Sequence, residues 1–348
     1  MKKELLFKML TTPSVSGYEL GFQKMLINEL KEVDDLVLTH HSYNVVHAIN
    51  PESKIKVMLL AHIDEIGLVI ERVLDNGICK LTNVGAIRPE MYMGQHVNVV
   101  RYDEKGGYTY VPGVIGYTAN YVDGHVKVED LNLDLGTSSK EETLKLVSMG
   151  DAVIHRDLYQ ELADNKLASR ALDDKIAAFI CTEVLRKVKE KSNNGVYFVA
   201  TVGEETTGRG AIFSTADVNP TCAIALDVGG SSDVAYRNNF TREVSLGKGG
   251  MLTYSAYSSK ILDKKLEEAS INKNIPVQHV VEVSKTWTDF DQVYKNNKGI
   301  PSTLISIPLR YMHSAVEVCS LKDVEYIVDL LVEFICNLTE EDSFDPFK

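Results

Sequence analysis

The spacing of apolar residues predicts strands that alternate with helices. Apolar positions recur at helical intervals over 19–33 and 172–191, whereas continuous apolar runs of strand length cover 44–49, 56–62 and 196–202. We further expect strands over 222–227 and 302–307, and helices from Gly208 or Arg209 onward, over 258–272 and over 321–338. This alternation predicts an α/β fold with a mixed central sheet and helices on both faces.

One stretch interrupts the alternation. Between about residues 71 and 159 the sequence is rich in short β-like segments separated by turn residues such as Asp75-Asn76-Gly77 and Gly106-Gly107. The expected strands cover 67–73, 94–102, 108–115 and 125–130. We therefore expect a discontinuous catalytic domain, 1–70 and 160–348, with a small all-β domain, 71–159, inserted into it.

Composition narrows the class of protein. The chain has 348 residues, of which 44% are hydrophobic and 25% charged, as in ordinary globular proteins. Its net charge of -12 argues against general nucleic-acid binding, which requires Lys and Arg to displace phosphate counterions. The five cysteines are dispersed, the start does not resemble a signal peptide, and the apolar runs are too short to span a bilayer. We expect a cytoplasmic protein without membrane partners.

Polar residues that could bind metal follow the predicted strands. His62 and Asp64 end one apolar run, and on an extended chain two residues apart they point to the same side. This pair suits a metal-binding imidazole and a carboxylate that orients it. Taken alone, the pair is also compatible with a solvated loop.

Two acidic pairs allow two interpretations each. Asp173-Asp174 opens a predicted helix, so one of them either caps that helix or turns inward to bridge two metals. Glu204-Glu205 directly follows an apolar strand, where an unpaired buried carboxylate would be costly. Glycines around this second pair favour a functional role over an acidic first helical turn.

Asp227 and His313 complete the set. Asp227 ends another strand and precedes a glycine pair, where it would otherwise cap a turn. His313 follows the apolar run 305–307, and a lone histidine there is more often structural.

The conjunction of these residues favours a paired-metal site. Strand ends that meet at one edge of a sheet would bring them together, and mixed nitrogen and oxygen ligands suit Zn²⁺, Co²⁺ or Mn²⁺. Two such ions can hold a bridging hydroxide and polarise a carbonyl. The chain supplies the expected number of ligands, namely Asp173 as the bridge, His62 and His313, and Asp227 and Glu205. Glu204 is left as the general base.

The motifs resemble the glutamyl-aminopeptidase and deblocking-aminopeptidase family, which includes tetrahedral aminopeptidases and some members labelled endoglucanase. The resemblance covers essentially the whole chain and implies a zinc-aminopeptidase-like α/β fold that bears an inserted β domain. It rests on Pro13-x-x-Ser16-Gly17-Tyr18-Glu19, A-H-x-D-E-I-G-L at 61–68, A-L-D-D at 171–174, E-E at 204–205, R-G-A at 209–211, D-V at 227–228 and I-S-I-P-L-R-Y-M-H-S at 305–314.

The resemblance implies roles for these residues. His62 and Asp227 would bind one metal and Glu205 and His313 the other, with Asp173 bridging. Glu204 would be the general base, Asp64 would orient His62, and the 173–174 peptide bond would be cis. The substrates would be short peptides, and the inserted domain would mediate dimers that assemble into a tetrahedral dodecamer.

The chain departs from the family pattern at two places. Thr206-Thr207-Gly208 stands where the family usually has Val-Gly-Leu, and Trp287-Thr288-Asp289-Phe290 stands where Gly-Thr-Asp-Ala is common. Both places are expected near the substrate pocket, which bulky Trp287 and Phe290 would narrow. Alternatives to an aminopeptidase are another metal-dependent amide hydrolase or deacylase and, with less support from a chain holding one Trp, a glycoside hydrolase.

Overall fold

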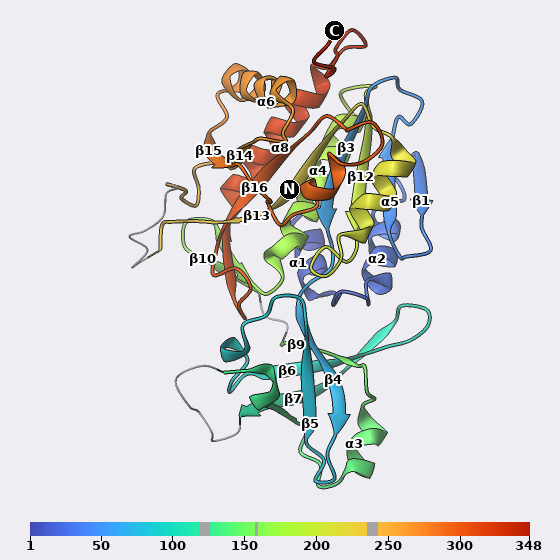
Figure 1. The fold of residues 1–348 in the computed structure, drawn as a ribbon, viewed down its shortest axis with the longest axis vertical. Coiled ribbons are helices and arrows are strands. Elements are labelled where there is room, and N and C mark those ends of the chain that lie inside the picture. Colours follow the sequence, from blue (N-terminus) through green and yellow to red (C-terminus); the bar gives the residue numbers. More distant parts are fainter. Residues whose placement is uncertain (118–125, 157–158, 235–242) are drawn as a thin grey trace.

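The computed structural model describes residues 1–117, 126–156, 159–234 and 243–348. It consists of a large α/β part and a smaller β-barrel, which lies below the α/β part in Figure 1. Among the described residues, no helix has both the length and the apolar character needed to cross a membrane.

The α/β part is built on a mixed sheet. Its middle strands are parallel: β3 pairs in parallel with β12 on one side and β13 on the other, and β13 pairs in parallel with β16. Further out, β2 pairs with β12 in the antiparallel direction. Across the sheet the strands are β1 (Leu36–Thr39), β2 (Val45–Ile49), β12 (Gly195–Thr201), β3 (Lys56–His62), β13 (Cys222–Gly230), β16 (Ser302–Arg310), β17 (Glu317–Ser320), β11 (Lys166–Ser169) and β10 (Tyr159–Leu162). β14 (Gly250–Ser255) pairs with β16 and with β15 (Val277–Glu282).

Helices cover both faces of this sheet, as the sequence predicts. Successive side chains of a strand point to opposite faces, so Leu59 of β3 enters one core cluster and Met58 and Leu60 enter the other. The helices packed in the first cluster are α1 (Lys3–Thr11), α2 (Leu20–Leu30), α4 (Leu172–Lys189), α6 (Lys260–Lys273) and α8 (Leu321–Cys336). Those packed in the second are α5 (Arg209–Val218) and α7 (Phe290–Val293).

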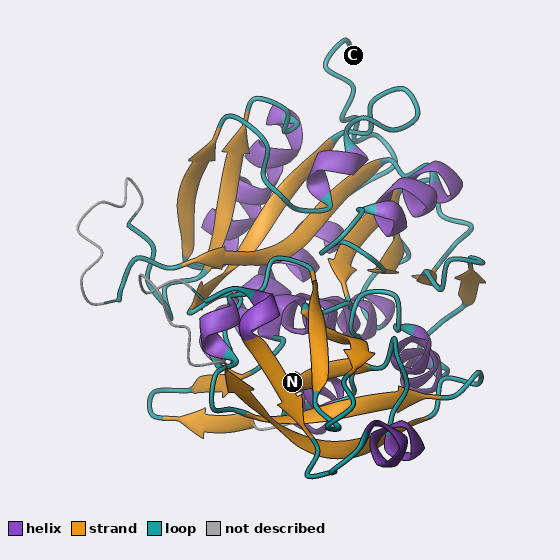
Figure 2. Cartoon of the chain, turned by 60° about the horizontal axis from the view of Figure 1, so that its bottom comes forward, coloured by secondary structure: helices purple, strands orange, loops and turns teal. Residues whose placement is uncertain are grey.

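The barrel interrupts the α/β part between β3 and β10. Figure 2 brings it toward the viewer. Its strands close in the order β4 (Gly67–Val73), β5 (Cys79–Val84), β8 (Leu131–Asp134), β7 (Tyr108–Tyr117), β6 (His96–Tyr102) and β9 (Ala152–His155), with α3 (Lys140–Leu146) alongside. A separate apolar cluster fills it. That residues 71–159 form a domain of their own stays a prediction.

One predicted strand is wrong. Residues 128–130 form a short 3₁₀ turn instead of the end of a strand over 125–130, and the strand β8 begins only at Leu131. Residue 125 lies outside the described residues. Asp130 accepts a hydrogen bond from the backbone of Lys127 at 3.0 Å, and this local bond competes with strand pairing.

The hairpin between β6 and β7 touches the α/β part. A Cβ atom placed on Gly21 of α2 would lie 2.5 Å from the carbonyl oxygen of Gly106, so the two backbones meet without a side chain between them. Lys24 donates to the backbone carbonyl of Lys105, and the Tyr110 hydroxyl donates to that of Thr11 at 3.3 Å. The barrel is therefore held against two helices of the α/β part.

Candidate active site

The predicted site residues lie at one edge of the large sheet. His62 is the last residue of β3, and Asp227 lies in the C-terminal half of β13. Glu204 and Glu205 follow the end of β12, and Asp173 lies in the first turn of α4. The neighbouring strands β12, β3 and β13 are parallel, so their carboxyl ends meet at this edge.

Asp173 lies between two imidazole rings. Its Oδ1 is 3.1 Å from Nε2 of His62, and its Oδ2 is 3.2 Å from Nε2 of His313. The peptide bond to Asp174 is cis, as the resemblance implies. One carboxylate thus faces two histidines from opposite ends of the chain.

The two glutamates lie beside these histidines. Oε2 of Glu204 is 3.9 Å from Nε2 of His62, and Oε1 of Glu205 is 3.8 Å from Nε2 of His313. Asp64 holds the backbone of both, because its carboxylate accepts the N–H of Glu204 at 3.1 Å and that of Glu205 at 3.3 Å. The same carboxylate is 3.7 Å from Nδ1 of His62, so Asp64 contacts both the imidazole and the glutamate loop.

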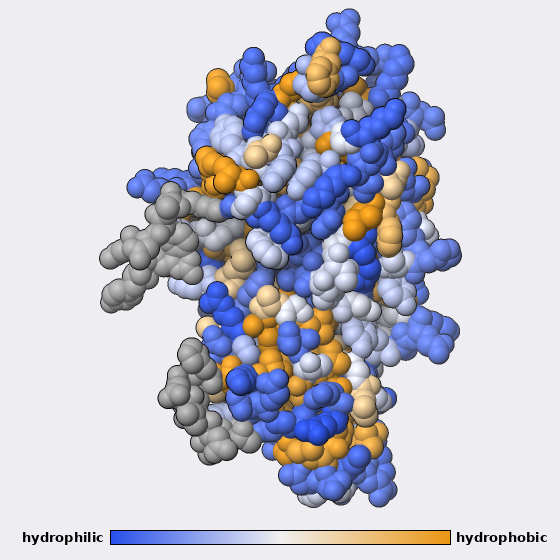
Figure 3. Space-filling model, viewed as in Figure 1, coloured by the Kyte–Doolittle hydropathy of each residue, from blue (hydrophilic) through white to orange (hydrophobic). Residues whose placement is uncertain are grey.

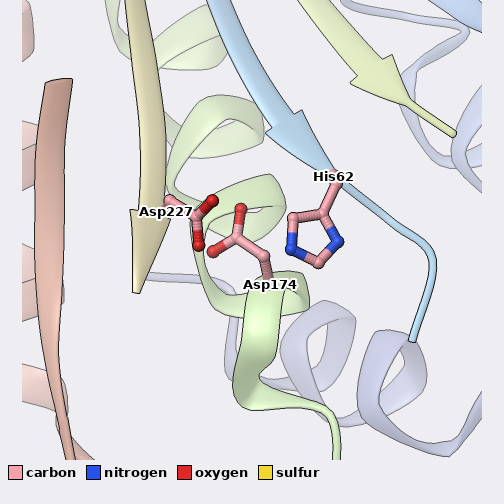
Figure 4. A group of neighbouring side chains, drawn as sticks. All are labelled: His62, Asp174 and Asp227. Carbon is pink, nitrogen blue, oxygen red and sulfur yellow. The ribbon is translucent and has the colours of Figure 1, made fainter. Parts of the chain in front are cut away.

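Asp174 and Asp227 form a further group with His62. Figure 4 shows the three side chains pointing toward one another, and each offers an atom within 4.8 Å of the others. A second such group consists of His62, Asp173 and Glu205. Asp174 is fully buried, and neither of its carboxylate oxygens has a hydrogen-bond partner among the described residues. Unpaired buried carboxylate oxygens indicate a missing cationic partner.

The site concentrates negative charge. Burial and the neighbouring Asp227 raise the pKa of Glu204 to about 9, and burial raises the pKa of Glu205 well above its ordinary value. Burial and Asp227 have the same effect on the pKa of Asp174. Burial also raises the pKa of Asp173, but His313 and His62 outweigh it and lower that pKa overall. The positive charge of two histidines does not balance the negative charge of so many carboxylates, whereas bound divalent cations would balance it.

The donor set fits transition-metal ions. Imidazole nitrogens and carboxylate oxygens are the ligands of Zn²⁺ and its neighbours. Two ligand atoms held at roughly 2.0–2.1 Å from one tetrahedral ion lie roughly 3.3 Å apart. The distances from the Asp173 oxygens to the two Nε2 atoms, 3.1 and 3.2 Å, are close to that value.

Sequence reasoning missed Glu317, which binds the backbone of two residues of the site. Its Oε2 accepts the backbone N–H of Asp173 at 3.1 Å, and its Oε1 accepts that of His313 at 2.9 Å. Glu317 is buried at the start of β17. A glutamate that opens the otherwise apolar run Val318-Cys319 is the signal that could have drawn attention to it.

A second missed group is the ion cluster of Glu65, Arg170 and Lys175. All three side chains are buried, and Lys175 Nζ lies 2.7 Å from Oε1 of Glu65 while Arg170 contacts Oε2. Glu65 also accepts the N–H of Ser14 at 3.0 Å. The cluster joins the segment that leads into the barrel to the segment that follows it.

A cavity of about 590 Å³ opens at the candidate metal ligands. Thr206, Thr207 and Trp287 line it, so both departures from the family pattern border this space. Phe290 does not line it, and the expectation that Phe290 narrows the pocket is wrong. Phe290 begins α7, and its ring is fully buried in a core cluster with Ala225 of the sheet.

Comparisons with known proteins show which sequences this chain is similar to. A family model described as M42 glutamyl aminopeptidase matches residues 44–330. The lysyl aminopeptidase of Pyrococcus furiosus is 30% identical over 333 residues, which cover 94% of each chain.

Two solved structures extend the similarity to the fold. An aminopeptidase of the archaeon Desulfurococcus kamchatkensis superposes with a TM-score of 0.89 at 30% identity, covering 97% of this chain and 94% of that one. A Pyrococcus horikoshii TET1 peptidase, described as assembling into a tetrahedron or a large octahedral shell, gives 0.81 at 28% identity, with 97% and 99% covered.

Proposed function

The chain belongs to the M42 glutamyl aminopeptidase family, and on that basis we propose that it removes the N-terminal residue of peptides with two divalent cations and Glu204 as general base. Membership makes it a metal-dependent peptidase. The number of ions, the ligand set and the base are the proposed part.

The position of Asp173 supports two ions more than any other observation. Its two oxygens lie at nearly equal distances, 3.1 and 3.2 Å, from the Nε2 atoms of His62 and His313. A carboxylate between two imidazoles is the arrangement expected of a bridging ligand.

Each of the two ions would have one further carboxylate ligand besides Asp173. Asp227 would complete the ion held by His62, and Glu205, whose Oε1 is 3.8 Å from His313, would complete the other. Zn²⁺, Co²⁺ or Mn²⁺ bound there would polarise the scissile carbonyl and make water more acidic. Asp64 would fix the orientation of His62 and of the backbone that bears the two glutamates.

Glu204 is the carboxylate best placed to move a proton. It lines the cavity and keeps a side-chain exposure of 14%, whereas Glu205 keeps 7%. It would accept the proton of the attacking water and then donate it to the leaving amine. Burial and Asp227 raise its pKa to about 9, and cations bound beside it would lower that pKa so that the carboxylate could accept a proton.

Replacement of the base separates catalysis from metal binding. We expect Glu204→Gln to lower kcat on aminoacyl-p-nitroanilides by roughly 10²–10⁴-fold while both ions stay bound, because the amide cannot accept a proton.

His313→Ala should lower metal content and activity together. Enzyme assays and elemental analysis measure both, with Glu341→Gln and His41→Ala as exposed controls. Retained activity in Glu204→Gln, or two bound ions in His313→Ala, would contradict the assignment.

We further propose that the protein self-associates through the barrel. The barrel exposes several large apolar side chains, and Figure 3 shows hydrophobic residues gathered on its visible face. The most exposed include Val114, Tyr117, Leu144 and Met149. Related peptidases form closed shells. Light scattering should give a mass that is a multiple of the 38.7 kDa chain, up to a dodecamer, and a monomer at micromolar concentration would refute this proposal.

A further inference from the structure

The cavity has a buried floor that is mostly apolar. Beyond the candidate metal ligands this floor is lined by Val228, Met251, Val280 and Leu304, each no more than 6% exposed. Thr253 and Ser306 are the buried hydroxyl residues among them. These side chains come from β13, β14, β15 and β16, so rigid strands hold the floor. A peptide whose free amino end reaches the metal site has one side chain to place in this space.

The floor is packed closely against the backbone. A Cβ atom on Gly229 would lie 2.9 Å from Sδ of Met251 and 3.1 Å from Cβ of Ser306. Because Gly229 has no side chain, the Met251 thioether can lie against the backbone of β13. A flexible and polarisable thioether suits an aliphatic guest.

The lining of the cavity also includes Trp287, the only tryptophan of the chain. Its side chain is 76% exposed although it is large and apolar. Its φ is +60°, and the Asp291 carboxylate fixes this turn by accepting the N–H of Thr286 at 3.1 Å and that of Trp287 at 3.0 Å. The indole is therefore presented at the mouth by an ordered backbone.

The charged groups at the mouth already have partners. Asp291 accepts the two backbone N–H groups and the Thr286 hydroxyl. Lys285 Nζ lies over the Trp287 ring, 3.8 Å from its centroid. Glu282 likewise has an interaction partner. Asp291 is thus engaged by the protein itself, and Lys285, which contacts a ring, is exposed and so is not part of the buried floor.

From this arrangement we propose that the cavity selects an uncharged, apolar N-terminal side chain such as Leu or Met, with the Trp287 indole as its outer wall. The inference rests on the proposed aminopeptidase function and specifies its substrate class. A charged side chain on the floor would lose its hydration without gaining an ion-pair partner, whereas an aliphatic one is transferred from water to apolar surface.

The first test compares substrates. We expect kcat/KM for Leu-p-nitroanilide to exceed that for Lys- and Glu-p-nitroanilide by about tenfold or more. A preference for Lys or Glu, or equal rates for all three, would overturn the inference and leave the peptidase function intact. If none is cleaved, the proposed function fails, and the binding experiment below decides about the pocket.

Two neighbouring residues provide a matched pair of variants. Val280 lies on the floor, whereas Val281 is 66% exposed and does not line the cavity. Val280→Asp should reduce the Leu-to-Lys ratio of kcat/KM by about tenfold, because it places a carboxylate on the floor. Val281→Asp should leave the ratio unchanged. An unchanged ratio in a folded Val280→Asp enzyme would refute the floor assignment.

Trp287 allows a test that needs neither turnover nor a floor variant. Because it is the only indole, all tryptophan emission comes from the cavity mouth. Adding L-leucinamide to zinc-loaded Glu204→Gln enzyme should shift the emission to shorter wavelength with saturation, and L-lysinamide should require at least about tenfold higher concentration. No shift with L-leucinamide, or a tighter response to L-lysinamide, would overturn the proposal.

Discussion

At the scale of single residues, the candidate site depends on groups that touch no substrate. Glu317 is the clearest example, since its two oxygens bind the backbone of Asp173 and of His313. Those two residues lie far apart in the sequence, and one carboxylate binds the backbone of both. Its effect on metal binding is therefore indirect.

Glu317→Gln should weaken metal binding while leaving the ligands in place. The amide keeps the shape of the side chain but replaces one acceptor with a donor, which cannot accept an N–H. We expect metal affinity and kcat/KM to fall by about 10- to 100-fold. Titration of the apo protein with Zn²⁺ measures the first, and excess metal should partly restore activity. Glu325→Gln, exposed on α8, is the control, and wild-type affinity in Glu317→Gln would contradict this role.

At the scale of elements, the loop between β12 and α5 determines where the two glutamates lie. Gly203 begins this loop with φ of +66°, and a Cβ atom there would lie 2.0 Å from Nη1 of Arg209. Arg209 in turn reaches Glu19 at 3.3 Å. The loop is thus packed against a guanidinium group, which would have to move to admit a side chain at position 203.

Gly203→Ala should therefore impair catalysis without removing a chemical group. Gly94 is a matched control, because its φ is +69° and nothing lies within 4 Å of its virtual Cβ. Both alanine variants should lose about 1–2 kcal/mol of stability from the left-handed backbone. Only Gly203→Ala should also lower kcat, by about 10- to 100-fold, as the glutamates shift. Equal kcat for the two variants would contradict the argument.

The longer elements could be predicted from the sequence. The strand β3 coincides with its predicted span of 56–62, and α4 ends within two residues of its predicted end, because both have long, regular apolar patterns. Short elements such as α3 and β17 were missed. Pairing with distant strands, more than local preference, determines such segments.

The site was predictable only in part, for a similar reason. The seven predicted residues gather at one sheet edge, because ends of parallel strands meet there whatever the intervening chain does. Glu317 is buried in an antiparallel strand of four residues, and its two partners are visible only in three dimensions. Likewise, local sequence leaves undecided which of Asp173 and Asp174 faces both histidines.

At the scale of the whole molecule, a buried ion cluster links the chain segments that come before and after the barrel. Glu65 precedes the first barrel strand, while Arg170 and Lys175 lie after the last one. Burial raises the pKa of Glu65, but Arg170 and Lys175 outweigh it and lower that pKa to about 2. Because this value lies below the ordinary 4.5, ionised Glu65 stabilises the fold fully above that pH, and the contribution is lost as pH falls through about 2.

Glu65→Gln should lower the free energy of unfolding at pH 6 by about 3–5 kcal/mol, because it leaves two buried cations without their carboxylate. The difference from the wild type should shrink as the pH falls from about 4.5 toward 2, since the wild type loses the contribution of ionised Glu65 over that range. Urea denaturation at several pH values measures this, with Glu90→Gln on the exposed barrel surface as control. A difference that stays constant with pH would contradict the assignment.

The strand order also has a consequence for synthesis of the chain. In the sheet β12 lies between β2 and β3, although it follows β3 by more than a hundred residues. At about 5–20 residues per second, a ribosome needs about 7 to 27 s to make the intervening chain. During that interval β2 and β3 lack the strand that pairs between them. The barrel strands are contiguous in sequence and can already close. The strand that leads to the two glutamates is thus made after all the barrel strands, and Asp227 and His313 are made later still. A nascent chain can therefore form its barrel before it can assemble the candidate site.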